Sequence, residues 1–475
     1  MNKSIVTNAA LNVIKTVLGI LFPILTYPYV TRILGVENMG IYNFSYSFIS
    51  YFQLVAALGI ATYGIREGVA YRDNKKQMNL FVSEVFTINM ISTIISYSLL
   101  FLLLFVVPQL LIYKTTILIL SAEIFFTTFG VSWICNVYED FLAIAIRTIL
   151  FQILSLILIF IFVKTNTDLN HYALILLLSN SGANLINFFY IRKKYCKFKI
   201  TAQIDWKRHI RPILVIFSTN IAITVYVSSD ITMLGLMTGN YQVGLYGTAV
   251  KIYTIIKNIL VSILVILIPR FSLMLSKGKK EETNLLFSQV FGILTVLMVP
   301  MCVGLFCISE DVVLLISGQE YLQAAIPLKI LTIAVVCSLY AYMFVQCILI
   351  PLREEKIVFQ ATVISAIINI ALNLFLIPFY GMNATAFTTV VAEFATFAIV
   401  YYHCKDKVKL VKNKRILTQT LLGSVGIIIV CMISKRIDML MMRVLISIIT
   451  SVLVYFAVLI LFHHRYVVNF LKKFP

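Results

Sequence analysis

The chain has 475 residues, of which 60% are hydrophobic and only 12% are charged, and its mean hydropathy is +0.96. Soluble domains are typically about 45–50% apolar and about 25% charged, so this composition excludes an ordinary soluble enzyme or binding domain. The formal net charge of +19 is compatible with nucleic acid binding, but the positions of the basic residues favour another explanation.

The apolar residues occur in runs long enough to cross a membrane. A helix needs about 20 mostly apolar residues to cross the hydrocarbon layer. The loops between the runs are too short to hold a soluble catalytic domain. The sequence therefore predicts an all-α integral membrane protein with about 14 transmembrane helices, at residues 8–30, 40–64, 81–107, 115–135, 141–163, 171–191, 212–237, 244–268, 285–308, 327–350, 357–378, 382–402, 416–434 and 441–462.

The basic residues lie mostly on one side of the predicted membrane. With a cytoplasmic N-terminus, the inner segments hold 29 of the 39 Lys and Arg residues. Cytoplasmic loops of membrane proteins carry such an excess, so both termini are expected in the cytoplasm. The basicity then reflects topology together with attraction to anionic lipid headgroups, and no nucleic acid partner is predicted.

The first two helices carry charged and polar residues at membrane depth or at their ends. Asn8, Asn12 and Lys15 follow helical spacing and share one face of helix 1. A lysine at the bilayer centre costs about 2.5–3.5 kcal/mol, so Lys15 either lines a hydrated cavity or extends to the inner surface. Arg32 ends helix 1 on the outer side and Arg66 ends helix 2 on the inner side, as cavity residues or as topology anchors.

Helix 8 carries a second polar face with two lysines. Lys251 and Asn258 share this face, and Lys257 lies near the middle of the helix. Lys257 is too deep to extend easily to the surface, which predicts a cavity or an ion pair. Lys251 either lines the cavity or pairs with Asp230 on helix 7. The two polar faces predict a cationic cavity between two helical bundles, and therefore an anionic substrate.

Two further carboxyl groups, Glu123 on helix 4 and Glu393 on helix 12, lie in mid-span. They and Asp230 are candidates for ion coupling, although a protonated and hydrogen-bonded carboxyl explains Glu123 and Glu393 slightly better. No cofactor is predicted apart from H⁺ or Na⁺ as a coupling ion. The eight cysteines and five histidines form no metal-ligand spacing, and no metal site is expected.

The chain repeats itself. KKQMNLFVSEVF begins at Lys75 and KKEETNLLFSQVF begins at Lys279, and upstream Leu34-Gly35 is matched with Leu234-Gly235 and Gly40 with Gly244. Helices 1–6 and 7–12 are therefore predicted to be parallel repeats, as in transporters that move two bundles about a central site. The predicted division is a first bundle over 1–196, a basic linker over 197–211, a second bundle over 212–404, and helices 13 and 14 with a basic tail over 405–475.

Motifs for chemistry or for direct use of ATP are not found. There is no GxxxxGK[ST], GxSxG or HExxH. Glu139-Asp140 is more readily explained as a helix N-cap than as an acid/base pair. We therefore expect a protein that is not an enzyme.

Two segments resemble a known family. PYVTRILGVENMGIY (28–42) and INIALNLFLIPFYGMNATAFTTVVAE (368–393) are similar to oligosaccharide flippases (O-antigen or capsular repeat-unit, Wzx-type) of the multidrug/oligosaccharidyl-lipid/polysaccharide (MOP) exporter superfamily. The second segment carries N-x3-N-x4-P-x2-G, but has Asn383 where the family commonly has glycine. The pattern residues are Asn369, Asn373, Pro378 and Gly381.

The resemblance implies a V-shaped pair of six-helix bundles with alternating access, resembling the multidrug (MATE) exporters. It also implies that the last two helices form a groove for a polyprenyl tail. The predicted function is to flip an undecaprenyl-diphosphate-linked oligosaccharide unit across the bacterial cytoplasmic membrane, for capsular or O-antigen-type polysaccharide. Membrane lipids and polysaccharide polymerase or assembly proteins are the expected further partners. The alternatives are a peptidoglycan-precursor lipid flippase, a cation-coupled multidrug exporter and, from another class, a polysaccharide polymerase.

Overall fold

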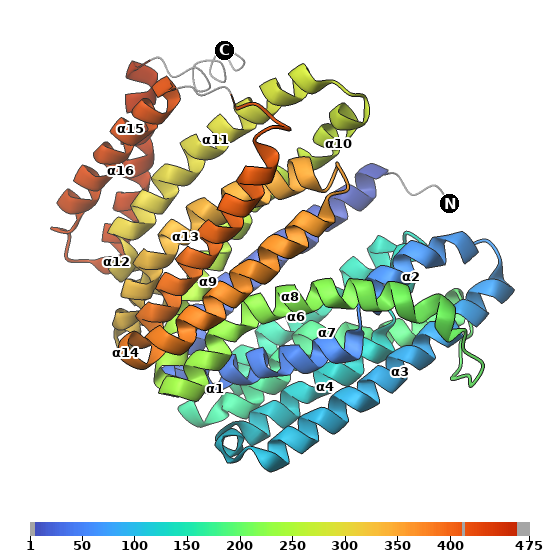
Figure 1. Cartoon of the computed structure of the whole chain (residues 1–475). Coiled ribbons are helices and arrows are strands. Elements are labelled where there is room, and N and C mark those ends of the chain that lie inside the picture. The colour runs from blue at the N-terminus through green and yellow to red at the C-terminus, as the bar shows by residue number, and fades with distance from the viewer. Residues whose placement is uncertain (1–4, 411–413, 463–475) are drawn as a thin grey trace. The chain divides into compact units, whose positions relative to one another are not determined.

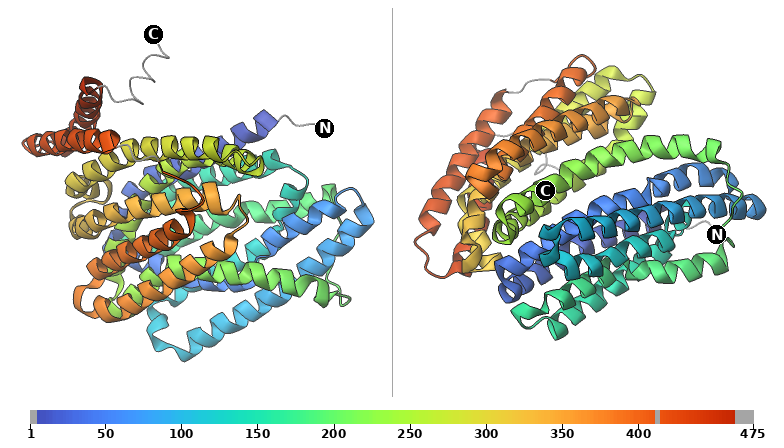
Figure 2. Two further views of the ribbon diagram at one scale, coloured as in Figure 1. Left: turned by 45° about the horizontal axis from the view of Figure 1, so that its top comes forward. Right: turned by 60° about the horizontal axis from the view of Figure 1, so that its bottom comes forward.

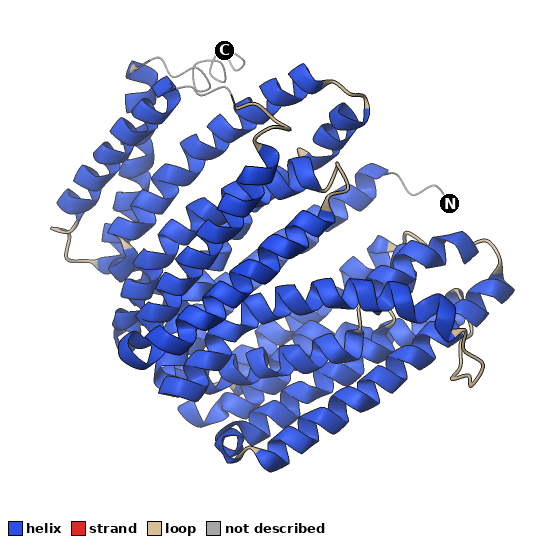
Figure 3. Cartoon of the chain, viewed as in Figure 1, coloured by secondary structure: helices blue, strands red, loops and turns tan. Residues whose placement is uncertain are grey.

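The structure, a computed structural model, describes the backbone of residues 5–410 and 414–462. Within these ranges it describes the side chains from Leu21 onward, together with Gly19. The described residues form helices joined by short loops, without a strand among them (Figure 3). The prediction of an all-α membrane protein is therefore confirmed.

The chain divides into two compact units, Met1–Gly244 and Leu245–Pro475, most of whose helices are labelled in Figure 1. The long helices of the first unit are joined by short ones. They are α1 (Ile5–Ala57), α2 (Ile60–Gly68), α3 (Lys75–Val106), α4 (Lys114–Gly130), α5 (Trp133–Val137), α6 (Phe141–Phe162), α7 (Leu169–Lys194) and α8 (Trp206–Thr238), with 3-10 turns at Val69–Tyr71, Pro108–Tyr113 and Asn166–Asp168.

The second unit has the same kind of organisation. Its first helix, α9 (Asn240–Val265), begins in the last residues of the first unit. The others are α10 (Ile268–Ser276), α11 (Lys280–Cys307), α12 (Ser309–Ser317), α13 (Ala325–Phe344), α14 (Glu355–Cys404), α15 (Lys414–Ser434) and α16 (Leu440–Leu461), with a 3-10 turn at Gln319–Ala324 and a π-helical turn at Val345–Leu349.

Twelve helical runs among the described residues are long and apolar enough to cross a membrane. Ten of them each contain one predicted span. Each of the other two, Leu21–Tyr71 and Glu355–Cys404, covers two predicted spans joined at a kink. The kinks are glycines with left-handed φ, Gly35 at 73° and Gly381 at 53°, where a side chain would be strained. The count of fourteen spans stays a prediction.

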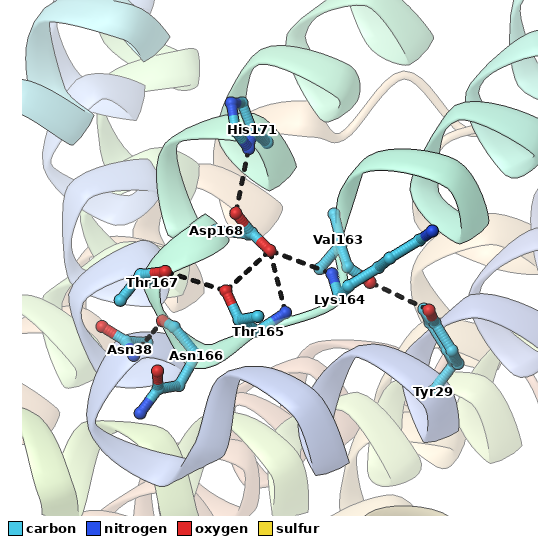
Figure 4. Close-up of polar contacts among 9 residues, drawn as sticks. All are labelled: Tyr29, Asn38, Val163, Lys164, Thr165, Asn166, Thr167, Asp168 and His171. Atoms are coloured by element: carbon cyan, nitrogen blue, oxygen red, sulfur yellow. Dashed lines mark hydrogen bonds and ion pairs between the residues drawn. The ribbon is translucent and has the colours of Figure 1, made fainter.

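The loop between α6 and α7 holds α1 on both sides of its kink (Figure 4). Before Gly35, the Tyr29 hydroxyl donates a hydrogen bond to the carbonyl of Val163 at 2.9 Å. After it, the Asn38 amide donates to the carbonyl of Asn166 at 2.8 Å. The loop itself is closed by a capping box, in which Asp168 accepts from the backbone and hydroxyl of Thr165. The bend of α1 is thus fixed by tertiary contacts.

The last two helices pack as a pair on α11 of the second unit (Figure 2). The Tyr455 hydroxyl donates to the carbonyl of Val296 at 2.7 Å, and Arg443 forms an ion pair with Asp311 at 3.0 Å. Gly423 lies against Tyr455, where a Cβ atom would meet the ring at 2.6 Å. Small residues of this kind allow helices in membranes to pack closely.

The backbone shows how the two repeats correspond. Gly35 has φ 73° and ψ 175°, and Gly239 has nearly the same conformation, with φ 95° and ψ 179°. These glycines are 204 residues apart, the same separation as Gly40 and Gly244. The match of Gly35 with Gly235 is therefore wrong by four residues, because the apolar sequence around them offers several similar alignments.

The predicted bundle boundaries stay predictions. One observation bears on α8, which was predicted to begin the second bundle. It packs on α1 inside the first unit, where Ser47 Oγ donates to the carbonyl of Ser228 at 2.8 Å and Ser50 Oγ lies 2.8 Å from Ser228 Oγ. Hydroxyl groups between helices form such bonds because lipid offers no alternative partner.

The expected helix cap at Glu139-Asp140 is confirmed in position only, since Asp140 is the N-cap residue of α6. Asp140 precedes α6, but its side chain makes no capping bond and is 96% buried. It accepts hydrogen bonds from the hydroxyls of Tyr190 and Tyr195, each at 2.5 Å, and from Lys194 at 2.8 Å. These donors satisfy the buried carboxylate more fully than two backbone N–H groups at a helix terminus.

Candidate functional site

The predicted residues that meet most clearly are Lys257 and Glu393 in the second unit. Lys257 lies on α9 and Glu393 on the second half of α14. The lysine Nζ lies 3.2 Å from Glu393 Oε1, and 3.3 Å from the hydroxyl of Tyr253. The Tyr253 hydroxyl also donates to Glu393 Oε1 at 3.4 Å. One cation, one carboxylate and one phenol therefore form a closed polar group inside the span.

This group is only partly shielded. The side chain of Lys257 is 28% exposed and that of Glu393 is 10% exposed. A carboxylate buried in this way needs donors, and Lys257 and Tyr253 supply them. The sequence assigned the lysine to substrate binding and the glutamate to ion coupling, and the structure places them in direct contact. The ion pair is one of the two alternatives predicted for Lys257.

Tyr253 was not predicted, although a signal was present. It stands four residues before Lys257 on the same helix face, and the ammonium lies 5.5 Å from the centre of its ring. A tyrosine one turn from a mid-span lysine can satisfy it with both its hydroxyl and its ring. The abundance of tyrosine in this chain (25 residues) concealed the pair.

The asparagine pattern of α14 positions the helix that carries Glu393. Asn373 Nδ2 donates to Asn369 Oδ1 at 3.1 Å, and Thr388 Oγ1 donates to Asn373 Oδ1 at 2.6 Å. All three side chains are buried. Thr388 lies beyond the Gly381 kink and the two asparagines lie before it, so the pattern joins the two legs of α14.

Lys251 has a different environment from Lys257. It is half-buried on α9 and forms no ion pair with any residue that the structure describes. Asp230, its predicted alternative partner, is 8% exposed and belongs to the first unit. Pairing of Lys251 with Asp230 stays a prediction. Asn258, on the predicted polar face, is exposed.

Glu123 is a buried carboxyl group within the first unit. It is 7% exposed on α4 and lies beside Gln53 and Ser181. Its Oε2 atom and the Ser181 hydroxyl lie near each other but form no hydrogen bond of good geometry with a described residue. A carboxylate oxygen in this position requires a proton, a cation or water. The surroundings, an amide, a hydroxyl and the nearby Tyr46, supply oxygen ligands.

Arg32 and Arg66, the other predicted cations whose side chains the structure describes, belong to the first unit. Arg32 is exposed near the end of the first leg of α1, and Arg66 is exposed on α2 and pairs with its neighbour Glu67 at 3.0 Å. The side chains of Asn8, Asn12 and Lys15 lie outside the described residues. No group of three metal-ligating side chains occurs in the part of the chain that the structure describes.

Comparison with known proteins gives a family. Residues 5–275, more than half of the chain, match the family described as polysaccharide biosynthesis protein. The chain belongs to this polysaccharide biosynthesis family. It is 23% identical over 370 residues to a putative O-antigen transporter of Shigella dysenteriae, covering 76% of this chain and 90% of the relative. It is 24% identical over 174 residues to a probable low-salt glycan biosynthesis flippase, Agl15, of Haloferax volcanii, covering 37% of this chain and 36% of that protein.

Solved structures share the fold of this family member. The lipid II flippase MurJ in an inward closed conformation superposes with a TM-score of 0.75 at 17% identity, covering 97% of this chain and all (100%) of that chain. An inward-facing multidrug resistance MATE family transporter of the MOP superfamily gives a TM-score of 0.65 at 14% identity, covering 81% of this chain and 93% of that one. The resemblance to polysaccharide-related transporters is confirmed by the family match and the O-antigen transporter relative, and the solved structures show the shared fold alone.

Proposed function

We propose that this member of the polysaccharide biosynthesis family flips an undecaprenyl-diphosphate-linked oligosaccharide unit from the inner to the outer leaflet of a bacterial cytoplasmic membrane. The observation that carries the proposal is Lys251, a half-buried cation on a membrane helix without an ion pair among the described residues. A lysine at this depth is stable only with water or an anion beside it. A diphosphate supplies the anion, and the family match and the named relatives favour a polysaccharide precursor as its carrier.

Lys257 and Glu393 would together adjust the charge on α9, the helix that also carries Lys251. While Glu393 is ionised, it neutralises Lys257 across 3.2 Å. Protonation of Glu393 would leave Lys257 free to bind a phosphate oxygen, and loss of that proton would restore the pair and release the anion. Anion binding at Lys257 and proton binding at Glu393 would then be linked, so that each changes the affinity for the other. Glu123 and Asp230 are further candidates for H⁺ or Na⁺ coupling.

The test removes the two lysine charges without removing the protein. Lys251→Gln/Lys257→Gln is expected to abolish surface polysaccharide in the native host, compared at equal amounts of parent and variant protein in the membrane. Lys277→Gln/Lys280→Gln, which removes two exposed charges at and just before the start of α11, is the matched control and should keep normal polysaccharide. Normal polysaccharide in the first variant would refute the proposed site.

The substrate is tested separately with purified protein in vesicles. Wild-type protein should move a lipid-linked oligosaccharide between leaflets, and the double lysine variant should not. Vesicles carrying lipid II provide the comparison, because the fold is shared with the lipid II flippase MurJ. Transport of lipid II in preference to the oligosaccharide would replace the proposed substrate with a peptidoglycan precursor.

A further inference from the structure

The segment between α7 and α8 is extended and is held in place by hydrogen bonds to α3. Backbone N–H groups of alternate residues, Lys197, Lys199 and Thr201, donate hydrogen bonds to side chains of α3. The acceptors are Asn79 Oδ1 at 2.8 Å, Ser83 Oγ at 3.2 Å and Thr87 Oγ1 at 3.0 Å. The chain leaving α7 is therefore attached to α3 at three successive points, as a strand is attached to a neighbouring strand.

The three acceptors suit this task because of their spacing and chemistry. They stand four residues apart and so form one stripe along α3. The hydroxyls of Ser83 and Thr87 donate to carbonyls of their own helix, at 2.6 and 2.7 Å, which leaves their lone pairs for the N–H groups of the linker. This stripe includes two residues of the repeated segment, and in the second copy Asn284 likewise accepts from the backbone N–H of Lys409 at 2.9 Å.

The same attachment decides which side chains face outward. Cys196 and Phe198 are 1% and 3% exposed, and the Phe198 ring packs 5.0 Å from that of Phe86. Side chains alternate along an extended chain, so Lys197 and Lys199 point away from this core and are exposed. Neither lysine forms an ion pair with any described residue.

The surroundings are strongly basic with an apolar border. Residues 192–211 contain one acid, Asp205, whose side chain caps α8 by accepting from Arg208 N at 3.2 Å. Ile200 and Trp206 are 64% and 44% exposed beside the lysines. The exposed cations of this stretch are Arg192, Lys193, Lys194, Lys197, Lys199, Lys207, Arg208 and Arg211. We name residues 192–211 the basic rail.

We propose that the basic rail is a fixed binding site for the phosphate headgroups of anionic membrane phospholipids. It lies between the end of one membrane helix, α7, and the start of the next, α8, which places it at headgroup depth. Exposed tryptophan is typical of that depth. Ammonium groups held on a pinned backbone bind a phosphate with little loss of side-chain and chain entropy, and Ile200 and Trp206 would contact the upper acyl chain. This inference is independent of which substrate is transported.

The chain contains its own probe for the test. It has two tryptophans, Trp206 in the rail and Trp133, which is 5% exposed. Full-length Trp133→Phe protein is reconstituted in phosphatidylcholine vesicles with increasing brominated phosphatidylglycerol, whose bromine quenches nearby tryptophan. Quenching of Trp206 by brominated phosphatidylglycerol is compared with quenching by brominated phosphatidylcholine. The comparison should show a preference for phosphatidylglycerol of about fivefold per lysine.

Two kinds of variant separate charge from geometry. Lys197→Gln/Lys199→Gln should reduce the preference by about 25-fold, about fivefold for each lysine removed, and Lys277→Gln/Lys280→Gln should leave it unchanged. Asn79→Ala keeps every charge but releases the rail at Lys197, and should also reduce the preference. Asn284→Ala, its equivalent in the second copy, is the matched control and should not.

Three results would overturn the proposal. The first is equal quenching by the two brominated lipids in the parent protein. The second is a preference that is the same in Lys197→Gln/Lys199→Gln as in the parent protein. The exposed side chains replaced in this variant leave folding intact even if Asn79→Ala does not fold. The third is complete displacement of brominated phosphatidylglycerol by undecaprenyl phosphate at about one molecule per protein, which would assign the rail to a polyprenyl lipid instead.

Discussion

At the scale of single residues, the membrane charges of this family member differ in how they are satisfied. Lys257 has a carboxylate and a phenol, Glu123 has a carboxyl oxygen without a partner among the described residues, and Lys251 has no ion pair among them. Charges in lipid are expensive, so a satisfied charge is compatible with a structural role. The groups left without partners are the ones that point to a ligand.

The Lys257–Glu393 pair predicts non-additive mutations. Lys257→Met leaves the Glu393 carboxylate buried without its cation and should lower stability by about 1–3 kcal/mol, because one partner of a buried pair is removed. Lys257→Met/Glu393→Gln should be more stable than Lys257→Met alone. Thermal unfolding of the purified variants measures both. Additive losses would show that the two side chains do not interact in the membrane.

The pH dependence of stability is predicted at Glu310, outside the membrane helices. The Lys329 ammonium donates to Glu310 at 2.6 Å and holds the pKa of this carboxyl below its usual range. The folded-state pKa is lowered, so the pair stabilises the fold above the unfolded pKa of about 4.3 and the contribution is lost as the pH falls through the lower folded value. Glu310→Gln should remove this part of the acid sensitivity.

Melting temperatures at pH 7 and at acidic pH, compared between the parent protein and the variant, test this prediction. Glu320→Gln is the matched control, because Glu320 is exposed and forms no ion pair with a described residue. The difference in melting temperature between Glu310→Gln and the parent protein should be largest at neutral pH and should disappear in acid. A difference that does not change with pH would contradict the prediction.

At the scale of elements, long helices are bent at glycines, and polar contacts fix the legs on either side. In α14 the asparagine pair and Thr388 join the two legs around Gly381. In α1 the loop before α7 joins the legs around Gly35. A glycine permits a sharp bend in the chain, but the angle must be set by something else. Here side-chain donors and carbonyl acceptors set it.

The bracing of α1 is testable by removing its two donors. Tyr29→Phe/Asn38→Ala should lower stability by about 1 kcal/mol for each hydrogen bond, since the acceptor carbonyls lie at a helix end where water can replace the donor. The measurement is thermal unfolding in nanodiscs. Asn258→Ala, which truncates an exposed asparagine of α9, should have no comparable effect. Equal melting temperatures for the parent protein and Tyr29→Phe/Asn38→Ala would show that Gly35 alone holds the bend.

At the scale of the whole molecule, the repeat appears as matched pairs of glycines. A Cβ atom on Gly40 would lie 1.9 Å from the carbonyl oxygen of Asn240, and one on Gly244 would lie 2.1 Å from that of Val36. Gly40 and Gly244 are 204 residues apart, and so are Val36 and Asn240. Each copy therefore presents its glycine to the backbone of the other copy at the equivalent position, all within the first unit.

This reciprocity predicts equal sensitivity at the two positions. Gly40→Ala and Gly244→Ala should each reduce the yield of folded protein, because the added methyl group meets backbone, which cannot move aside. The cost of such overpacking is about 1–3 kcal/mol. Gly304→Ala is the control, since its nearest contact would be an ordinary 3.8 Å from Ile427. Size-exclusion profiles of the three variants measure the difference. Tolerance of alanine at either Gly40 or Gly244 would refute the close approach.

The amino-acid sequence by itself determined the class of the protein, the approximate position of its spans and the presence of a repeat. These follow from composition, run length and identity along the chain, which are local properties that the bilayer imposes on any spanning helix. The family resemblance likewise came from residues close together in sequence, such as Asn369, Asn373 and Gly381.

Only the tertiary structure decided which charges meet, because a contact between distant residues depends on packing that no local pattern records. It joined Lys257 to Glu393 across 136 positions and attached the linker after α7 to the Asn79 stripe of α3. It also showed that Gly35 corresponds to Gly239 and not to Gly235. Both glycines have apolar neighbours and resemble each other in sequence, but the backbone conformation distinguishes them. Hydrophobicity determines which segments form membrane helices, while the few polar groups determine which distant segments contact one another.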